Sequence, residues 1–165
     1  MKNKLVLGLL LLLISCTTKT SNAIVVLENN EINNQAVAQL DTPERALVLW
    51  YLYAYGNECD GTTSKIKCKL LDEIGISNEC DAKHLSILLQ WFSTDMLAVY
   101  KLNKCPSMGV KSAIQNEFKK IILHRNKDTL SIDYKVKGMN NSQEKYWNIE
   151  KTDSYIIRGK TLVKQ

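Results

Sequence analysis

The spacing of hydrophobic residues changes along the chain at about residue 106. Before that point apolar residues recur every three or four positions, and after it they alternate with polar residues. The first spacing is typical of amphipathic helices and the second of strands with one buried face. Helices followed by strands predict an α+β fold, in which N-terminal helices pack on a C-terminal antiparallel sheet of about four strands.

The first predicted helix runs from Thr42 to Tyr55. Thr42 is suited to the N-cap position, Pro43 to the first helical position and Glu44 to the first turn, where acidic residues are favoured. Gly56 is expected to end the helix. Its body is apolar or aromatic on every face, so we expect neighbouring elements to cover most of its sides.

Two more helical stretches are expected before the spacing changes. One covers about 65–74 and ends at Gly75, and the other follows Asp81 and extends toward residue 100. The polar residues around Ser93 make a break or sharp bend in the second stretch the favoured interpretation.

The alternating region predicts an antiparallel meander with turns at 126–128, 138–142 and 152–154. The segment 112–118 fits either a helix end or the entry to the first strand. The expected strands are Ile121–Arg125, Thr129–Lys137, Lys145–Lys151 and Tyr155–Val163.

The first sixteen residues have the three parts of a secretory signal. Lys2 and Lys4 precede the apolar run Leu5–Ile14, which is too short to span a bilayer, because spanning takes ~20 residues. Leu13-Ile14-Ser15-Cys16 resembles the lipobox of bacterial lipoproteins. The resemblance implies cleavage before Cys16 and lipidation of that cysteine with palmitate or similar chains; an ordinary signal peptide that ends near a cysteine is the alternative.

Lipidation would anchor the mature protein in the cell envelope, with its domain in the periplasm or at the cell surface. Thr17 after the cysteine favours the outer over the inner membrane. The expected organisation is a signal peptide at 1–15, a flexible tether rich in Ser, Thr, Asn and Gln at 16–40, and one α+β domain at 41–165. Within the tether, Ala23–Leu27 is suited to a short edge strand.

Four cysteines remain besides Cys16, and an even number in an oxidising compartment favours two disulfides. The candidates are Cys59, Cys68, Cys80 and Cys105. Pairing Cys59 with Cys68 requires Cys80 to pair with Cys105, which is possible only if the intervening helix folds back. We favour this pairing, and the other two stay open. No Cys-x-x-Cys spacing occurs, so neither a metal nor a cofactor is expected.

Net charge is unevenly distributed in a chain that is +5 overall, with an acidic part at 16–100 and a basic part at 101–165. The basic part either attracts an anionic partner or solubilises the sheet and protects its edges. Nucleic acid is not expected as a partner, because the chain is exported and has no recognisable binding motif.

The layout resembles the nuclear transport factor two-like (SnoaL-like) superfamily over residues 42–160. Thr42-Pro43-Glu44, followed by Tyr51 and Tyr53, matches its first helix, and Lys145-Tyr146-Trp147-Asn148-Ile149 matches a strand near its end. The resemblance implies a curved sheet around the first helix. It does not fix the function, because the superfamily includes enzymes, binding domains and immunity proteins.

The aromatic helix is the candidate wall of a pocket. Trp50, Tyr51, Tyr53, Tyr55 and Asp95 either line a small-molecule site or pack as ordinary core residues.

No catalytic residue is assigned. His84 and His124 are the side chains whose ordinary pKa lies near neutrality, and a dyad of Asp95 with His124 is conceivable. Solvent exposure of His124 is favoured. Nucleophile elbows, phosphate loops and metalloprotease helices are absent from the sequence, which favours a protein that is not an enzyme.

Three functions are therefore weighed. The first is a membrane-anchored envelope lipoprotein that binds another protein, for example as an immunity or inhibitor protein against a toxin or cell-wall hydrolase. The loop Glu58–Gly61 is its candidate contact. The second is a cone-shaped domain that binds or converts a small molecule, and the third is a structural accessory subunit of an envelope complex.

Overall fold

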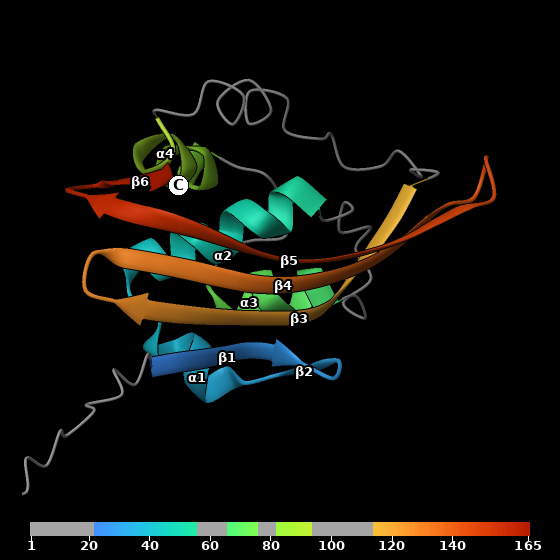
Figure 1. Cartoon of the computed structure of the whole chain (residues 1–165), viewed down its shortest axis with the longest axis horizontal. Helices are drawn as coiled ribbons and strands as arrows, with labels where there is room; N and C mark the ends of the chain where they lie inside the picture. The colour runs from blue at the N-terminus through green and yellow to red at the C-terminus, as the bar shows by residue number, and fades with distance from the viewer. Residues whose placement is uncertain (1–21, 56–65, 76–81, 94–113) are drawn as a thin grey trace, which may run out of the picture.

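The computed structural model describes residues 22–55, 66–75, 82–93 and 114–165. This part of the chain forms four helices and one six-stranded antiparallel sheet (Figure 1). The helices are α1 (Asn34–Gln39), α2 (Thr42–Tyr55), α3 (Ile66–Glu73) and α4 (Ala82–Trp91). The strands are β1 (Asn22–Glu28), β2 (Glu31–Ile32), β3 (Ile114–Asn126), β4 (Thr129–Asn140), β5 (Lys145–Arg158) and β6 (Thr161–Lys164). None of these helices is both long and apolar enough to cross a bilayer.

The sheet has the strand order β2-β1-β3-β4-β5-β6. Strands β3 to β6 form a meander of consecutive hairpins, but β5 and β6 differ from the predicted strands Lys145–Lys151 and Tyr155–Val163. The turn predicted at 126–128 is confirmed, since Asn126 pairs with Thr129 and Lys127 adopts the positive φ of 54° that such tight turns use. The sequence left either a helix end or a strand entry possible at 112–118, and the structure has a strand from Ile114 onward.

The turn predicted at 152–154 is wrong. Strand β5 continues through Thr152, Asp153 and Ser154 to Arg158, and the chain turns only at Gly159, which has a φ of 61°. The three polar residues fit a strand because their side chains alternate between the two faces of the sheet and find partners on both.

The sheet also takes up part of the segment expected to be a tether. Strand β1 pairs with β3 from Asn22, opposite Arg125, and its side chains Val26 and Leu27 are fully buried. Helix α1 follows, with Val37 in the core. The sheet thus has six strands rather than about four. The strand that the sequence allowed at Ala23–Leu27 is present as β1, although it lies between β2 and β3 and not at the edge.

One face of the sheet, here called the inner face, packs against the helices, and Figure 1 shows α2 and α3 behind the strands. A bulge between Phe118 and Lys120 keeps both Phe118 and Ile121 on this face. The opposite face is here called the outer face. Buried inner-face side chains come from Phe118, Ile121 and Leu123 in β3, Leu130, Ile132, Tyr134 and Val136 in β4, and Tyr155 in β5.

Helix α2 has the predicted bounds but a different N-cap. The Asp41 carboxylate accepts a hydrogen bond from the Glu44 backbone N–H (3.1 Å), and the Glu44 carboxylate accepts one from the Asp41 N–H (2.9 Å). This reciprocal pair is a capping box, so Asp41 rather than Thr42 caps the helix. Arg125 of β3 contacts Asp41 at 2.6 Å and thereby ties the helix start to the sheet.

The second and third predicted helices are present as α3 and α4. Helix α4 ends at Trp91, just before the residue Ser93 where a break was expected. The segment 94–113 lies outside the described residues, so the bend required by the favoured disulfide pairing stays a prediction.

Candidate functional site

The aromatic side chains expected to line one pocket point in two directions. The Trp50 ring packs on Phe92, with ring centroids 5.2 Å apart, and the Tyr53 ring lies 5.3 Å from Nζ of Lys67 in α3. Tyr51 and Tyr55 instead face the sheet and stack on each other, with centroids 6.2 Å apart. Of the four predicted pocket residues that the structure describes, Tyr51 and Tyr55 are therefore the two that it brings together.

Tyr51 reaches a carboxylate on the inner face of the sheet. Its hydroxyl donates a hydrogen bond to Asp153 and lies 2.9 Å from the hydroxyl of Tyr155. Lys164 of β6 completes the group, with Nζ 2.9 Å from the other Asp153 oxygen. Burial alone would raise the pKa of Asp153, but the hydrogen bonds from Tyr51 and Lys164 hold it below its ordinary value.

Two more tyrosines extend this group into the core. The hydroxyls of Tyr55 and Tyr134 lie 3.1 Å apart, and the Tyr51 and Tyr134 rings have centroids 4.7 Å apart. Burial is the main cause that raises the pKa of Tyr51 and of Tyr134 well above that of a free phenol. The hydrogen bond to Asp153 adds to the effect for Tyr51, and the hydrogen bond to Tyr55 adds to it for Tyr134. We call Tyr51, Tyr55, Tyr134, Tyr155 and Asp153 the tyrosine cluster. The raised pKa values of Tyr51 and Tyr134 suit these two phenols to be hydrogen-bond donors and not general bases.

Asp153 was not among the residues predicted from the sequence. It was assigned to a turn, because Thr152-Asp153-Ser154 has the composition of one. The available signal was that apolar residues before and after the polar run keep the same two-residue phase, with Trp147 and Ile149 before it and Tyr155 and Ile157 after it.

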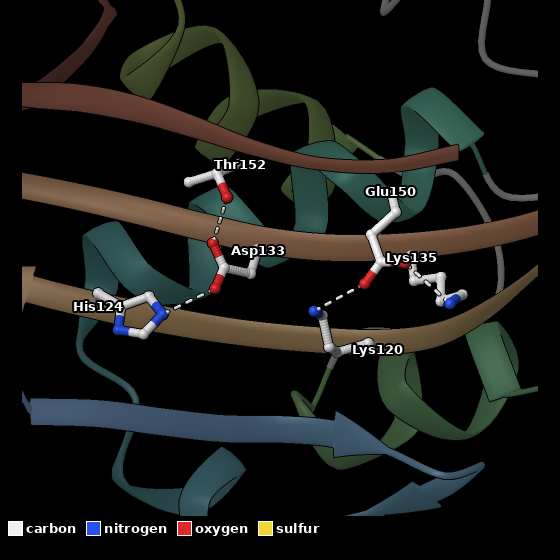
Figure 2. A network of polar contacts seen from close by, with 6 residues as sticks. All are labelled: Lys120, His124, Asp133, Lys135, Glu150 and Thr152. Atoms are coloured by element: carbon white, nitrogen blue, oxygen red, sulfur yellow. Dashed lines mark hydrogen bonds and ion pairs between the residues drawn. The ribbon is translucent and has the colours of Figure 1, made fainter. Parts of the chain in front are cut away.

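A second polar group lies on the outer face, where Figure 2 shows side chains from three adjacent strands. Asp133 of β4 is at its centre. One of its oxygens lies 3.0 Å from Nε2 of His124 in β3, and the other accepts a hydrogen bond from the Thr152 hydroxyl in β5 at 2.7 Å. Burial acts to raise the pKa of Asp133, but the bonds to Thr152 and His124 lower it overall.

Further along this face, Glu150 of β5 is likewise a carboxylate that two side chains contact. Its two carboxylate oxygens lie 3.1 Å from Nζ of Lys120 and 2.8 Å from Nζ of Lys135. The hydrogen bonds from Lys135 and Lys120 lower the pKa of Glu150. We call Lys120, His124, Asp133, Lys135, Glu150 and Thr152 the outer-face network (Figure 2).

The outer-face network has the composition of an acid–base site but a different geometry. Asp133 lies between Thr152 and His124 and contacts both, whereas in a nucleophile–histidine–carboxylate arrangement the histidine would lie in the middle. His124 is half-buried, with 33% of its side chain exposed, and its carboxylate partner is Asp133. Asp95 lies outside the described residues, and the described part of the chain holds no cluster of three potential metal ligands.

Two hollows that the described residues line both lie away from α2. The larger, of about 410 Å³, lies between α3 and the ends of β3 and β4. Lys67, only 9% exposed, and Phe118 contribute to its wall, together with the exposed Tyr146. The smaller lies near Asn30 and α3.

Several predicted site residues fall outside the part of the chain that the structure describes. They are Cys16, Cys59, Cys80, Cys105 and the loop 58–61, together with the side chain of His84. Cys68 is buried in α3, at 2% exposure, and has a partner. The lipidation and the disulfide pairing therefore stay predictions.

Comparisons with known proteins identified no relative. Neither a protein-family model, nor a curated protein, nor a solved structure matches the chain.

Proposed function

We propose that this protein is a lipid-anchored binding protein of a bacterial envelope that contacts a protein partner through the outer face of its sheet. The observation that carries the proposal is the outer-face network. Six charged or polar side chains from β3, β4 and β5 are held there by direct contacts with one another, on the face opposite the helices.

Such a surface is suited to selective protein recognition. Side chains that are already ordered lose less conformational entropy when a partner binds. Both signs of charge are present in fixed positions, since Lys120 and Lys135 lie on either side of Glu150. A fixed pattern of opposite charges favours a complementary partner and disfavours others.

The anchoring part of the proposal rests on the lipobox-like Leu13-Ile14-Ser15-Cys16. Only residues 17–21 separate Cys16 from the first strand. Six residue steps span at most ~20 Å when fully extended. The domain would then sit close to the membrane, and its partner would be another envelope protein, such as a toxin or hydrolase that acts there.

The resemblance to the nuclear transport factor two-like superfamily belongs to the same proposal. Its support is that the helix opening with Thr42-Pro43-Glu44 packs through Tyr51 on an antiparallel sheet. The Tyr51 and Tyr55 hydroxyls already have partners within the domain, which favours a binding role for the domain over a catalytic use of these phenols.

The test is affinity purification of the lipidated protein, tagged at its C-terminus, from crosslinked and solubilised envelopes. Glu150→Lys would place three lysines together and break both ion pairs of Glu150. Glu31→Lys is the matched control, because it makes the same change on the short strand β2, where the side chain is also exposed.

A stoichiometric protein partner that is retained by Glu31→Lys and lost with Glu150→Lys would support the proposal. Recovery of the same partner with both variants would show that the interface lies outside the outer-face network. Absence of any partner, from a folded and membrane-bound sample, would contradict the proposal.

A small-molecule site is the second candidate, and the hollow of about 410 Å³ favours it. Its wall combines apolar Ile66 and Phe118 with basic Lys67 and Lys137, which suits an apolar molecule with an acidic group. Native mass spectrometry of protein taken directly from envelopes tests this. An added mass that disappears in Phe118→Ala but not in Leu162→Ala, a buried site outside the hollow, would support it.

The third function, a structural accessory subunit, predicted a large exposed apolar patch. Among the described residues, Tyr146 is the one large hydrophobic side chain that is strongly exposed, at 75%. A single side chain does not form such a patch.

A further inference from the structure

Strand β5 has a long stretch of unpaired edge within the described sheet. Its side toward β4 is paired from Lys145 to Ile156. On its other side, β6 pairs only with Tyr155–Arg158. The stretch Lys145–Asp153 therefore has no neighbouring strand among the described residues, and Figure 1 shows β5 extending well past β6.

The backbone groups that face this edge can be identified. The Ser154 carbonyl accepts a hydrogen bond from the Gln165 N–H, on the β6 side of the strand. Backbone groups of successive residues point to alternate sides of a strand. The N–H and C=O groups of Tyr146, Asn148, Glu150 and Thr152 therefore point out of the edge.

This edge carries charged side chains but has none of the backbone features that usually prevent pairing. Proteins shorten or distort their edge strands, or place proline in them, because unpaired backbone groups attract other strands. The opposite edge of the sheet follows this rule, since β2 has only 2 residues. Strand β5 has 14 residues, contains neither proline nor glycine and pairs with β4 without a bulge. It also carries the exposed Tyr146.

We infer that the edge of β5 pairs with the same edge of a second copy of this chain. The two strands run antiparallel about a two-fold axis at Ile149, which is the midpoint of the unpaired stretch. Asn148 then lies opposite Glu150 of the second copy, and Tyr146 lies opposite Thr152 of the second copy. These residues carry the outward-pointing backbone groups, so the two chains share a ladder of hydrogen bonds and form one continuous sheet.

The side chains favour this register. Lys145 lies opposite Asp153 of the second copy, which joins opposite charges. A shift of one residue would place inner-face side chains against outer-face ones. The next register toward the β4–β5 turn would place Lys145 opposite Lys151, which is a repulsive pair.

Site-directed crosslinking tests the inference in the lipidated full-length protein, in membranes. At the axis, the two copies of residue 149 form a pair without mutual backbone hydrogen bonds, whose Cα atoms lie ~4.5 Å apart. This distance is compatible with a disulfide. We expect Ile149→Cys to give a covalent dimer of twice the monomer mass under mild oxidation. Thr152→Cys is the matched control, because its two copies would be separated by several residues of strand.

A second variant distinguishes loss of pairing between the two chains from loss of folding. Asn148→Pro removes an N–H that points out of the edge and leaves the ladder with β4 intact. We expect Ile149→Cys combined with Asn148→Pro to stay monomeric with an unchanged circular dichroism spectrum, whereas Asn148→Ala in the same background still gives the dimer.

Three results would overturn the inference: folded Ile149→Cys protein that gives no dimer, equal crosslinking of Thr152→Cys, or a crosslinked product that contains a different protein.

Discussion

The hydroxyl of Tyr51 in α2 donates a hydrogen bond to the carboxylate of Asp153 in β5, 102 positions later in the chain. Lys164 holds the other oxygen of the same carboxylate. One acidic side chain thus connects the central helix, the longest strand and the last strand. Because Asp153 is only 17% exposed, losing a partner would leave a poorly solvated charge.

Replacing Tyr51 with Phe removes the phenol hydroxyl and keeps the ring. We expect the free energy of unfolding to fall by about 1–3 kcal/mol, because a mostly buried carboxylate loses a hydrogen bond. Urea titration followed by circular dichroism measures the change. Tyr146→Phe is the control, since Tyr146 is 75% exposed and its loss of a hydroxyl should change stability little. Equal changes in the free energy of unfolding for the two variants would show that the hydrogen bond from Tyr51 to Asp153 does not stabilise the fold.

Acid should destabilise the protein through Asp153. The folded-state pKa of Asp153 is held below the ordinary value of 3.8 by Tyr51 and Lys164, against the opposing effect of burial. As the pH falls, Asp153 is therefore protonated in the unfolded chain before it is protonated in the folded protein. The stabilisation is complete well above pH 3.8 and is lost as the pH falls through the folded-state value.

Unfolding free energies measured between pH 6 and pH 2.5 should fall less steeply for Asp153→Asn than for the unmodified protein. Glu44 has a raised pKa, mainly because of burial, and acts in the opposite sense. It is present in both proteins, so the difference between the two curves isolates Asp153. Parallel curves would contradict the prediction.

Gly138 gives Trp147 the space to lie across β4. A Cβ atom at position 138 would overlap both Nε1 of Trp147 and the Asn116 oxygen that accepts its hydrogen bond. We expect Gly138→Ala to lower the free energy of unfolding by about 1–3 kcal/mol, as overpacking typically does. Adding Trp147→Ala should recover part of the loss. If the double variant is as unstable as the sum of the two single variants, the clash is not the cause.

The capping box of α2 should contribute measurably to stability. Asp41→Ala removes the acceptor for the Glu44 N–H together with the ion pair to Arg125. We expect a loss of about 1 kcal/mol, the usual cost of removing an N-cap. Asp41→Asn keeps an N-cap acceptor and loses only the charge, so it should cost less in the same urea titrations. Equal losses would assign the whole effect to the ion pair.

The proposed lipidation, which rests on the lipobox-like Leu13-Ile14-Ser15-Cys16, leads to a chemical prediction. Cells grown with an alkyne-labelled fatty acid should incorporate the label into the unmodified protein and into Cys68→Ser, but not into Cys16→Ser, because Cys16 is the expected acyl acceptor. Detection on a gel after click chemistry measures this. Label in the Cys16→Ser protein would assign the lipid to another residue, and its absence from the unmodified protein would remove the proposed anchor.

Local patterns in the sequence determined much of the fold. The start signal Thr42-Pro43-Glu44 and the stop signal Gly56 predicted the bounds of α2, and the spacing of apolar positions predicted where α3 and α4 lie. Strict alternation and the Asn126-Lys127-Asp128 turn predicted the β3–β4 hairpin. These features depend on residues close to one another in the chain, so a single sequence contains the information needed to predict them.

Tertiary structure alone decided the position of β1, the continuity of β5 and the partners of the predicted tyrosines. Strand β1 is ordered by pairing with β3, about a hundred residues away. Asp153 stays in a strand because Tyr51 and Lys164 meet it on the inner face. Its neighbour Thr152 points to the outer face and bonds Asp133. Local composition favoured a turn at these residues, and hydrogen bonds from distant residues outweighed that preference.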